Sequence, residues 1–210
     1  MIELSQRYDS SGRKKKSQET KVKLYNAAIK LFNKYGYENV TVSQITGKAG
    51  VGKGTFYIHY QSKEAILIEQ FDKIDRFYLE RYNHSDKCVK AKEQLMAFLK
   101  NVAELTEDVL GIDSVKVVYK SQINSPENLK LLIDENRLYF KIIQEIITFG
   151  QKRNEFRSDM TAREITMLLT RFVRGIIYEW ILHDGGFDLT TEFKKSFCLY
   201  LRLIDMNDSH

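Results

Sequence analysis

The 210-residue chain contains a single proline, Pro126, and only 11 glycines. Proline and glycine are the residues that most often interrupt helices, whereas leucine, lysine and glutamate, which fill the stretches between them, favour helix. So few interruptions leave little room for the many turns of a β fold. The sequence therefore predicts an all-α protein with long helices.

Hydrophobic residues make up 43% of the chain, enough for a small domain joined to a larger one. No apolar core of a signal peptide is present in residues 1–16, and no segment approaches about 18 uninterrupted apolar residues. Cys88 and Cys198 lie far apart without metal-ligand spacing, so we expect them to pack inside a protein of a reducing compartment. We expect a cytoplasmic protein with no membrane segment, metal site or cofactor.

Positive charge is concentrated near the N-terminus. Residues 1–63 contain 12 Lys and Arg against 4 Asp and Glu, whereas the remaining residues contain 21 against 24. Concentrated positive charge favours a polyanionic partner, because each phosphate contact releases condensed counterions. A solvated lysine-rich surface is the alternative interpretation.

The N-terminal region divides into an arm and three short helical segments. Residues 1–16 have nothing apolar to bury and are expected to form a flexible basic arm. Apolar residues then recur at helical spacing as far as Tyr35, and Gly36 supplies a left-handed stop. Thr41 and Gln44 have the spacing of a capping box, which predicts the start of a second helix. A third helical segment covers residues 52–60.

Larger helices are predicted for the rest of the chain. Ser62 caps a fourth helix that continues past Tyr82 and is long enough to connect two domains. Ser125 and Pro126 predict a further helix start, with serine as the cap and proline in the first turn. The β-branched run over 115–123 is compatible with a strand, but no second strand is available to pair with it. After the fourth helix, a helix beyond about Asp86 is predicted to run through residues 95–105, and further helices are predicted over 115–123, 129–149, 162–181 and 189–204.

Residues 47–53 permit two functional interpretations. They match all but the last position of the phosphate-loop pattern GxxxxGK[ST], but Gly54 stands where a hydroxyl must bind magnesium. The pattern also requires a preceding strand, and a capping box precedes these residues instead. A nucleotide hydrolase is therefore only a remote alternative. In the second interpretation, Gly50 makes the turn of a helix-turn-helix, and Gly52 and Gly54 let the backbone approach phosphates closely.

The segment 20–67 contains a long set of residues that match one family of DNA-binding domains in register. They are Ala27, Ala28, Phe32, Gly36, Tyr37, Val40, Thr41, Val42, Ile45, Ala49, Gly50, Val51, Lys53, Gly54, Thr55, Tyr57, Tyr60, Ser62, Lys63 and Glu64. Through these residues the segment resembles the DNA-binding domain of the TetR family of transcriptional regulators. The departures are Thr46, Gly47 and Gly52, and Tyr60 is an aromatic match where the family often has phenylalanine. Glycine inside a helix, as at Gly47, costs about 1 kcal/mol relative to alanine.

The resemblance implies DNA-contacting roles for several residues of this segment. Phosphate contacts are implied for Tyr57, His59 and Lys63, and contacts nearest the base edges for Gln44, Lys53, Gly54 and Thr55. Thr41 and Gly52 complete the expected DNA-binding set. Lysine can donate to guanine and threonine can contact a thymine methyl, which agrees with these roles. As alternatives, Gln44 only completes its capping box, Lys53 is a solvated charge and His59 packs.

The same resemblance implies a regulatory domain over residues 64–210, after a DNA-binding domain over 17–63. Its last two helices would pair with their symmetry mates in a homodimer, and its middle helices would enclose a pocket for a small, largely apolar effector. The pocket candidates are polar-tipped residues within apolar stretches: Tyr119, Tyr139, Arg171, Arg174, Trp180 and His183. Two of them, Arg171 and Arg174, are able to meet an acid group.

We therefore expect a ligand-responsive repressor that binds a palindromic operator as a homodimer and is released by its effector. A DNA-binding activator or a structural DNA-binding protein without ligand sensing is the alternative. No enzyme is expected, because the four histidines are scattered and neither HExxH nor GxSxG occurs.

Overall fold

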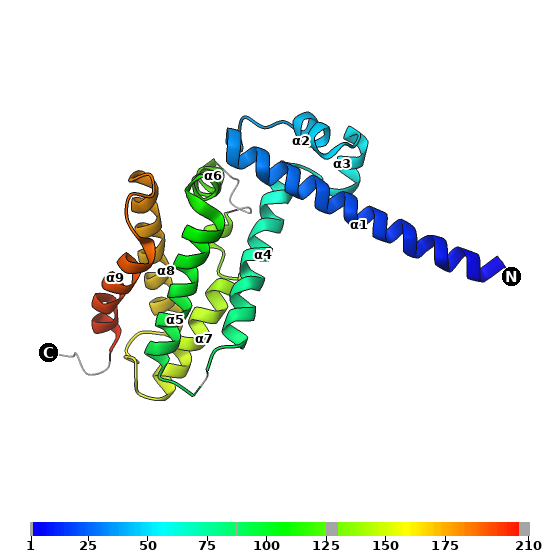
Figure 1. The fold of residues 1–210 in the computed structure, drawn as a ribbon. Coiled ribbons are helices and arrows are strands. Elements are labelled where there is room, and N and C mark those ends of the chain that lie inside the picture. The colour runs from blue at the N-terminus through cyan, green and yellow to red at the C-terminus, as the bar shows by residue number, and fades with distance from the viewer. Residues whose placement is uncertain (1, 87, 125–129, 206–210) are drawn as a thin grey trace. The chain divides into compact units, whose positions relative to one another are not determined.

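The computed structural model describes residues 2–86, 88–124 and 130–205, and Figure 1 shows its fold. Within these residues every regular element is a helix, apart from one isolated antiparallel bridge between Phe156 and Asp205. The prediction of an all-α protein is confirmed. The chain divides into two compact units, Met1–Gln70 and Phe71–His210.

The first unit is built from helices α1 (Ile2–Tyr35), α2 (Val42–Ala49), α3 (Lys53–His59) and the first turns of α4 (Lys63–Asn83). Gly36 ends α1 with a φ of +80°, and its amide donates to the Phe32 carbonyl over 2.8 Å. A glycine suits this position because a left-handed backbone strains residues that carry a Cβ. The unit's core consists of Leu24, Ala27, Ala28, Leu31, Phe32, Tyr37, Val40, Ile45, Phe56, Tyr60, Ile66 and Leu67.

The first helix is longer than the sequence predicts. Residues 1–16 are expected to be a flexible arm, but α1 begins at Ile2. The reason is that Lys, Arg, Gln and Glu favour helix and no proline interrupts this segment, so the helix extends N-terminally from the part whose residues, from Leu24 onward, pack in the core.

The second unit contains the remainder of α4 and the helices that follow it. These are α5 (Ala91–Glu104), the π-helical turn η1 (Leu105–Leu110), α6 (Gly111–Asn124), the 3₁₀ turn η3 (Leu131–Ile133), α7 (Leu138–Lys152), α8 (Ala162–Leu182) and α9 (Leu189–Ile204). Helix α7 packs against α8, and α5 packs against both α7 and α9. One continuous hydrophobic core forms between them, including Leu95, Phe98, Ile143, Ile146, Leu169, Val173 and Phe197.

Three local expectations need correction. The helix predicted over 129–149 begins only at Leu138, and its predicted start at Ser125 and Pro126 lies outside the described residues. The expected domain boundary after Lys63 differs from the division of the two units after Gln70, because residues in the first turns of α4 are buried in the first unit. Cys88 and Cys198 are exposed rather than packed.

Candidate DNA-binding surface and ligand cavity

The turn between α2 and α3 has the geometry expected of a helix-turn-helix. The Thr41 hydroxyl accepts from the Gln44 amide over 3.3 Å, and the Gln44 side-chain carbonyl accepts from the Thr41 amide over 2.7 Å. Gly50 then ends α2 with a φ of +70°. Ile45 and Phe56 are fully buried and hold α2 and α3 to the rest of the unit. The capping box predicted from the sequence is therefore present.

The phosphate-loop alternative does not fit this geometry. Gly47 and Lys48 lie within α2, and Lys53 begins α3 after the N-cap residue Gly52. A phosphate loop instead connects a buried strand to the helix that follows it. The segment 47–53 is thus part of a helix-turn-helix.

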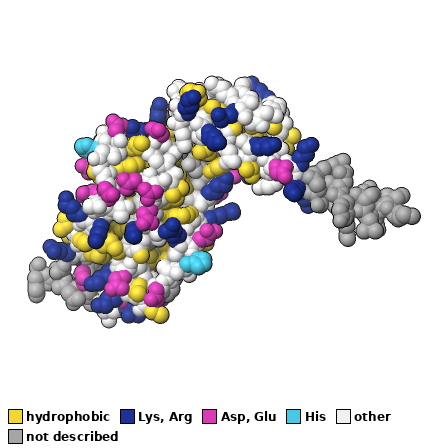
Figure 2. Space-filling model, in the orientation of Figure 1, with side chains coloured by type: hydrophobic (Ala, Val, Ile, Leu, Met, Phe, Trp, Pro, Cys, Tyr) yellow, Lys and Arg dark blue, Asp and Glu magenta, His cyan; other side chains and the backbone are white. Residues whose placement is uncertain are grey.

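Helix α3 presents a mixed polar and apolar surface to solvent. Lys53 and Gly54 are exposed, and the side chains of Tyr57 and Ile58 are 56% and 79% exposed. Thr55 and His59 are partly buried on the same helix. Figure 2 shows mostly Lys and Arg among the charged side chains on the visible face of this unit. Such a surface is suited to a polyanion.

Lys63 has a structural role that the sequence did not reveal. Its ammonium group donates to the carbonyls of Tyr37 and Val40 over 3.0 and 2.9 Å and lies 4.3 Å from the centre of the Tyr37 ring. The Tyr37 hydroxyl in turn donates to Glu64 over 2.6 Å. Through these hydrogen bonds, Lys63 connects the segment between α1 and α2 to the start of α4. One of its three N–H donors remains for a phosphate.

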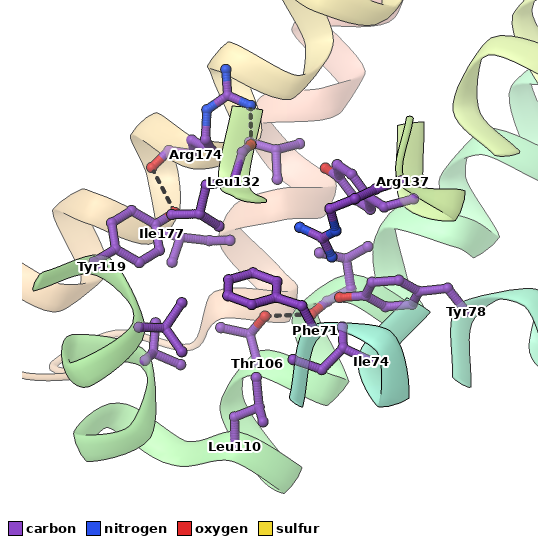
Figure 3. Close-up of a pocket in the computed structure, with 15 residues that line it drawn as sticks. Phe71, Ile74, Tyr78, Thr106, Leu110, Tyr119, Leu132, Arg137, Arg174 and Ile177 are labelled. Atoms are coloured by element: carbon purple, nitrogen blue, oxygen red, sulfur yellow. Dashed lines mark hydrogen bonds between the residues drawn. The ribbon is translucent and has the colours of Figure 1, made fainter. Parts of the chain in front are cut away.

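A cavity of about 80 Å³ lies within the second unit (Figure 3). Its lining comes from α4, α5, η1, α6, η3, α7 and α8 and is mostly apolar. The residues that line it are Phe71, Ile74, Tyr78, Val102, Thr106, Leu110, Val115, Val118, Tyr119, Leu132, Arg137, Tyr139, Val173, Arg174 and Ile177. The π-helical turn η1 contributes Thr106 and Leu110, which agrees with the frequent occurrence of such turns at functional sites.

Three of the six residues predicted to bind a ligand line this cavity: Tyr119, Tyr139 and Arg174. The other three lie outside it. Arg171 is exposed on α8, and the buried Trp180 donates to the Phe187 carbonyl over 3.0 Å. The ring of His183 packs against that of Phe187, with ring centres 6.0 Å apart. Sequence reasoning included neither Arg137 nor Tyr78 among the pocket candidates, although both line the cavity.

Arg137 lines the cavity as one half of a buried ion pair. Its guanidinium makes two hydrogen bonds to the Asp75 carboxylate, with Nε 3.1 Å from Oδ2, and a third to the Leu131 carbonyl. The Asp75 carboxylate also accepts from the Leu138 amide over 3.2 Å, which satisfies the first turn of α7. The guanidinium lies 4.6 Å from the Phe71 ring centre. The pair thus connects α4 to the start of α7.

Arg174 is the second guanidinium of the cavity, and its charge is not balanced by any carboxylate within the described residues. It donates to the Leu132 carbonyl over 3.0 Å, the hydrogen bond drawn between these two residues in Figure 3. Partial burial lowers its pKa, although an arginine stays protonated in a protein. Because Asp75 neutralises Arg137, the lining keeps one positive charge in excess.

Apolar side chains on α8 and α9 are left exposed in a regular pattern. Leu168, Tyr178 and Leu182 on α8 are 42%, 48% and 65% exposed, and Leu199 and Leu203 on α9 are 62% and 66% exposed. Their spacing places each set on one face of its helix. Exposed large apolar residues aligned in this way are typical of a protein interface.

Two family models match the chain. The model described as "Bacterial regulatory proteins, tetR family" matches residues 24–69, and the model described as "YsiA-like protein, C-terminal region" matches residues 71–202, more than half of the chain. The chain belongs to the TetR family of transcriptional regulators. The resemblance seen in the sequence is confirmed, and this TetR-family protein is a DNA-binding regulator rather than an enzyme.

Individual relatives of this TetR-family regulator are more distant. The fatty acid metabolism regulator protein of Bacillus subtilis is 26% identical over 172 residues, which cover 80% of this chain and 87% of the relative. The uncharacterized regulator YerO of the same organism is 21% identical, and the match covers 86% of this chain and 62% of YerO.

Solved structures share the fold. FadR from Bacillus halodurans superposes with a TM-score of 0.73 at 22% identity, covering 87% of this chain and 94% of that one. FadR from Bacillus subtilis, in complex with stearoyl-CoA, has a TM-score of 0.72 at 23% identity and covers 90% and 99% of the two chains. FadR from Thermus thermophilus, in complex with lauroyl-CoA, has a TM-score of 0.68 at 22% identity, with 87% and 93% covered.

The described residues provide neither a membrane-spanning helix nor a cluster of metal ligands. None of their helices is long and apolar enough to cross a membrane. Nor do they contain a group of three or more His, Cys, Asp or Glu side chains placed to hold a metal ion.

Proposed function

We propose that this regulator is a ligand-responsive repressor that binds a palindromic operator as a homodimer and is released by an effector with a long apolar acyl chain. The observation that carries the proposal is the apolar cavity bordered by α4. Helix α4 continues from this cavity into the DNA-binding unit, where Ile66 and Leu67 are buried. Because α4 is one continuous helix, a ligand that displaces it at the cavity would also move its first turns, which pack in the DNA-binding unit.

The class of effector rests on the lining and on the relatives. Aliphatic and aromatic side chains dominate the cavity, and they suit a methylene chain. The FadR structures of Bacillus subtilis and Thermus thermophilus were obtained with stearoyl-CoA and lauroyl-CoA. We infer that a fatty acyl compound is the effector of this chain as well. The repressor would act in the cytoplasm and require no further cofactor.

The size of the cavity supports a ligand-dependent change of conformation. Its volume of about 80 Å³ is well below the roughly 300–1,000 Å³ of occupied ligand pockets. A long acyl chain can therefore enter only if the lining helices move apart. An effector that binds the wider state more tightly shifts the population toward it, and DNA affinity falls if that state holds the two DNA-binding units at the wrong spacing.

The DNA contacts proposed for each half-site combine positioning and base recognition. Tyr57, His59 and Lys63 would bind phosphates, and Thr41 would position the start of α2. The residues nearest the bases would be Gln44, Lys53, Gly54 and Thr55, with Gly52 allowing close approach of the backbone. A two-fold dimer places its recognition helices about 34–36 Å apart, one turn of DNA, so the operator is expected to be an approximate palindrome.

The dimer would form through α8 and α9. The exposed apolar faces defined by Leu168, Tyr178 and Leu182 on α8 and by Leu199 and Leu203 on α9 support this assignment. Two such faces from each of two protomers would form a four-helix interface.

Selection of bound DNA from a random duplex pool, followed by titration with palmitoyl-CoA, tests the proposal. The expected result is an enriched palindrome that the protein releases as palmitoyl-CoA is added. Val118→Phe, which fills the cavity from α6, should bind the operator but no longer respond. Ile123→Phe, at a residue of α6 that is 69% exposed, is the matched control and should respond normally. No enriched sequence, or operator affinity unchanged by acyl compounds of every chain length, would contradict the proposal.

A further inference from the structure

Two of the tyrosines that line the cavity have hydroxyls without a hydrogen-bond partner among the described residues. Tyr78 on α4 is 5% exposed, and its ring centre lies 5.7 Å from that of Tyr139 on α7. Both rings also pack against Phe98, with ring centres 5.5 and 5.9 Å away. Figure 3 shows the Tyr78 hydroxyl pointing into the cavity toward Thr106. Neither hydroxyl forms a hydrogen bond with any residue that the structure describes.

Other buried or partly buried tyrosines have partners. The Tyr119 hydroxyl, in the same cavity, donates to the Arg174 carbonyl over 3.3 Å, and the Tyr200 hydroxyl donates to the Ile165 carbonyl over 3.1 Å. Throughout the described residues, each fully enclosed polar side-chain atom is paired. The Tyr78 and Tyr139 hydroxyls are consequently not fully enclosed, which leaves each of them accessible to a ligand that enters the cavity.

The stability of the fold does not explain why these two positions carry tyrosine rather than phenylalanine. Phenylalanine would preserve the ring contacts and would avoid placing an unpaired hydroxyl in an apolar cavity, which is unfavourable. Burial raises the pKa of both tyrosines above the ordinary value of 10.0, so both stay neutral and can donate a hydrogen bond. The other polar side chains of the cavity are engaged as well, since Arg137 binds Asp75 and Thr106 donates to the Val102 carbonyl.

We propose that the hydroxyls of Tyr78 and Tyr139 bind the carbonyl oxygen of the effector's acyl group. This inference rests on the proposed function and adds to it the chemical group that the cavity recognises. A carbonyl oxygen accepts two hydrogen bonds, which matches two neighbouring donors on facing helices. A free carboxylate and a thioester both present such an oxygen. Arg174, whose charge is not balanced by a carboxylate among the described residues, also lines the cavity and could bind a negatively charged group of the effector. An alkyl chain without a carbonyl leaves both hydroxyls unpaired.

The test compares two ligands, palmitoyl-CoA and its thioether analogue S-hexadecyl-CoA. They differ only in that the thioether has a methylene group in place of the thioester carbonyl. Dissociation constants are measured by calorimetry for the wild type, Tyr78→Phe and Tyr139→Phe, and melting temperatures are measured without ligand. The wild type should prefer the thioester by about tenfold, and each variant should lose most of that preference while keeping or raising the melting temperature. A purely structural role would instead lower the melting temperature.

Tyr119→Phe is the matched control, because it removes a hydroxyl from the same cavity that is already paired. It should lower the melting temperature and keep the ligand preference. Palmitate, in a parallel titration, distinguishes the sources of the carbonyl: binding of palmitate that both Tyr→Phe variants weaken assigns the pair to a free carboxylate. Variants that keep the wild-type preference would overturn the inference and leave the proposed function intact. A wild type that binds none of these compounds would overturn both.

Discussion

Asp75 and Arg137 form an ion pair whose side chains are only 8% and 11% exposed. Removing one partner leaves the other charge buried without compensation, which typically costs about 3–5 kcal/mol. We expect Asp75→Ala to lower the free energy of unfolding by about this amount, because the variant also loses the carboxylate that accepts from the Leu138 amide. Urea denaturation followed by circular dichroism measures the change. The control is Asp72→Ala, at an exposed residue one helical turn before Asp75 on α4, and it should change the free energy of unfolding little.

Lys63 and Thr55 should differ in how they affect DNA binding. Lys63→Ala removes hydrogen bonds to two carbonyls and a candidate phosphate contact, so it should destabilise the first unit by about 1–3 kcal/mol and weaken all DNA sequences about equally. Thr55→Ala should relax the preference at one base pair and leave the others unchanged. A binding panel of single-base operator variants makes the comparison, with the exposed Lys48→Ala as a control for the loss of charge. Identical profiles for the first two variants would refute these assignments.

At the scale of single elements, two helical glycines should respond oppositely to alanine. A Cβ added at Gly47 in α2 would meet no atom within 4 Å, so Gly47→Ala should stabilise the first unit by about 0.5–1 kcal/mol. A Cβ added at Gly150 in α7 would lie 2.8 Å from the Ala91 Cβ and would collide with the Phe156 ring. Gly150→Ala should therefore destabilise the second unit by about 1–3 kcal/mol. Thermal unfolding shows whether the two signs differ, and a stabilised Gly150→Ala variant would be incompatible with this close packing.

Element boundaries were predicted well where local chemistry decides them. The capping box predicted at Thr41 is present and α2 begins immediately after it, and the helix predicted from residue 162 begins there, after a second capping box at Thr161. The start of α7 at Leu138 was not predictable, because it depends on Asp75, a residue on another helix. The N-terminal extent of α1 was underestimated, because residues 1–16 lack the hydrophobic periodicity by which a helix is recognised in a sequence.

At the scale of the whole molecule, the proposed dimer depends on the exposed apolar faces of α8 and α9. The double variant Leu182→Glu and Leu203→Glu places a charge on each face and should convert the dimer to monomers. Operator affinity should then fall by at least about tenfold, because a monomer binds a single half-site and loses the gain in affinity that comes from binding both half-sites at once. Light scattering after size-exclusion chromatography measures the mass. Val109→Glu, at an apolar residue that is 66% exposed on η1, is the matched control and should remain dimeric.

The all-α class, the helix-turn-helix and the TetR family were predictable from the sequence, because few helix breakers, a capping box and an in-register motif are all local properties of the chain. Three of the proposed ligand-binding residues, Tyr119, Tyr139 and Arg174, line the cavity. That Arg171, Trp180 and His183 lie outside the cavity, and that Arg137 and Tyr78 line it, became visible in the folded chain alone. The physical reason is that helical periodicity tells which face of a helix is buried. Whether that face meets packed side chains, an ion-pair partner or an open cavity depends on residues brought together from distant helices.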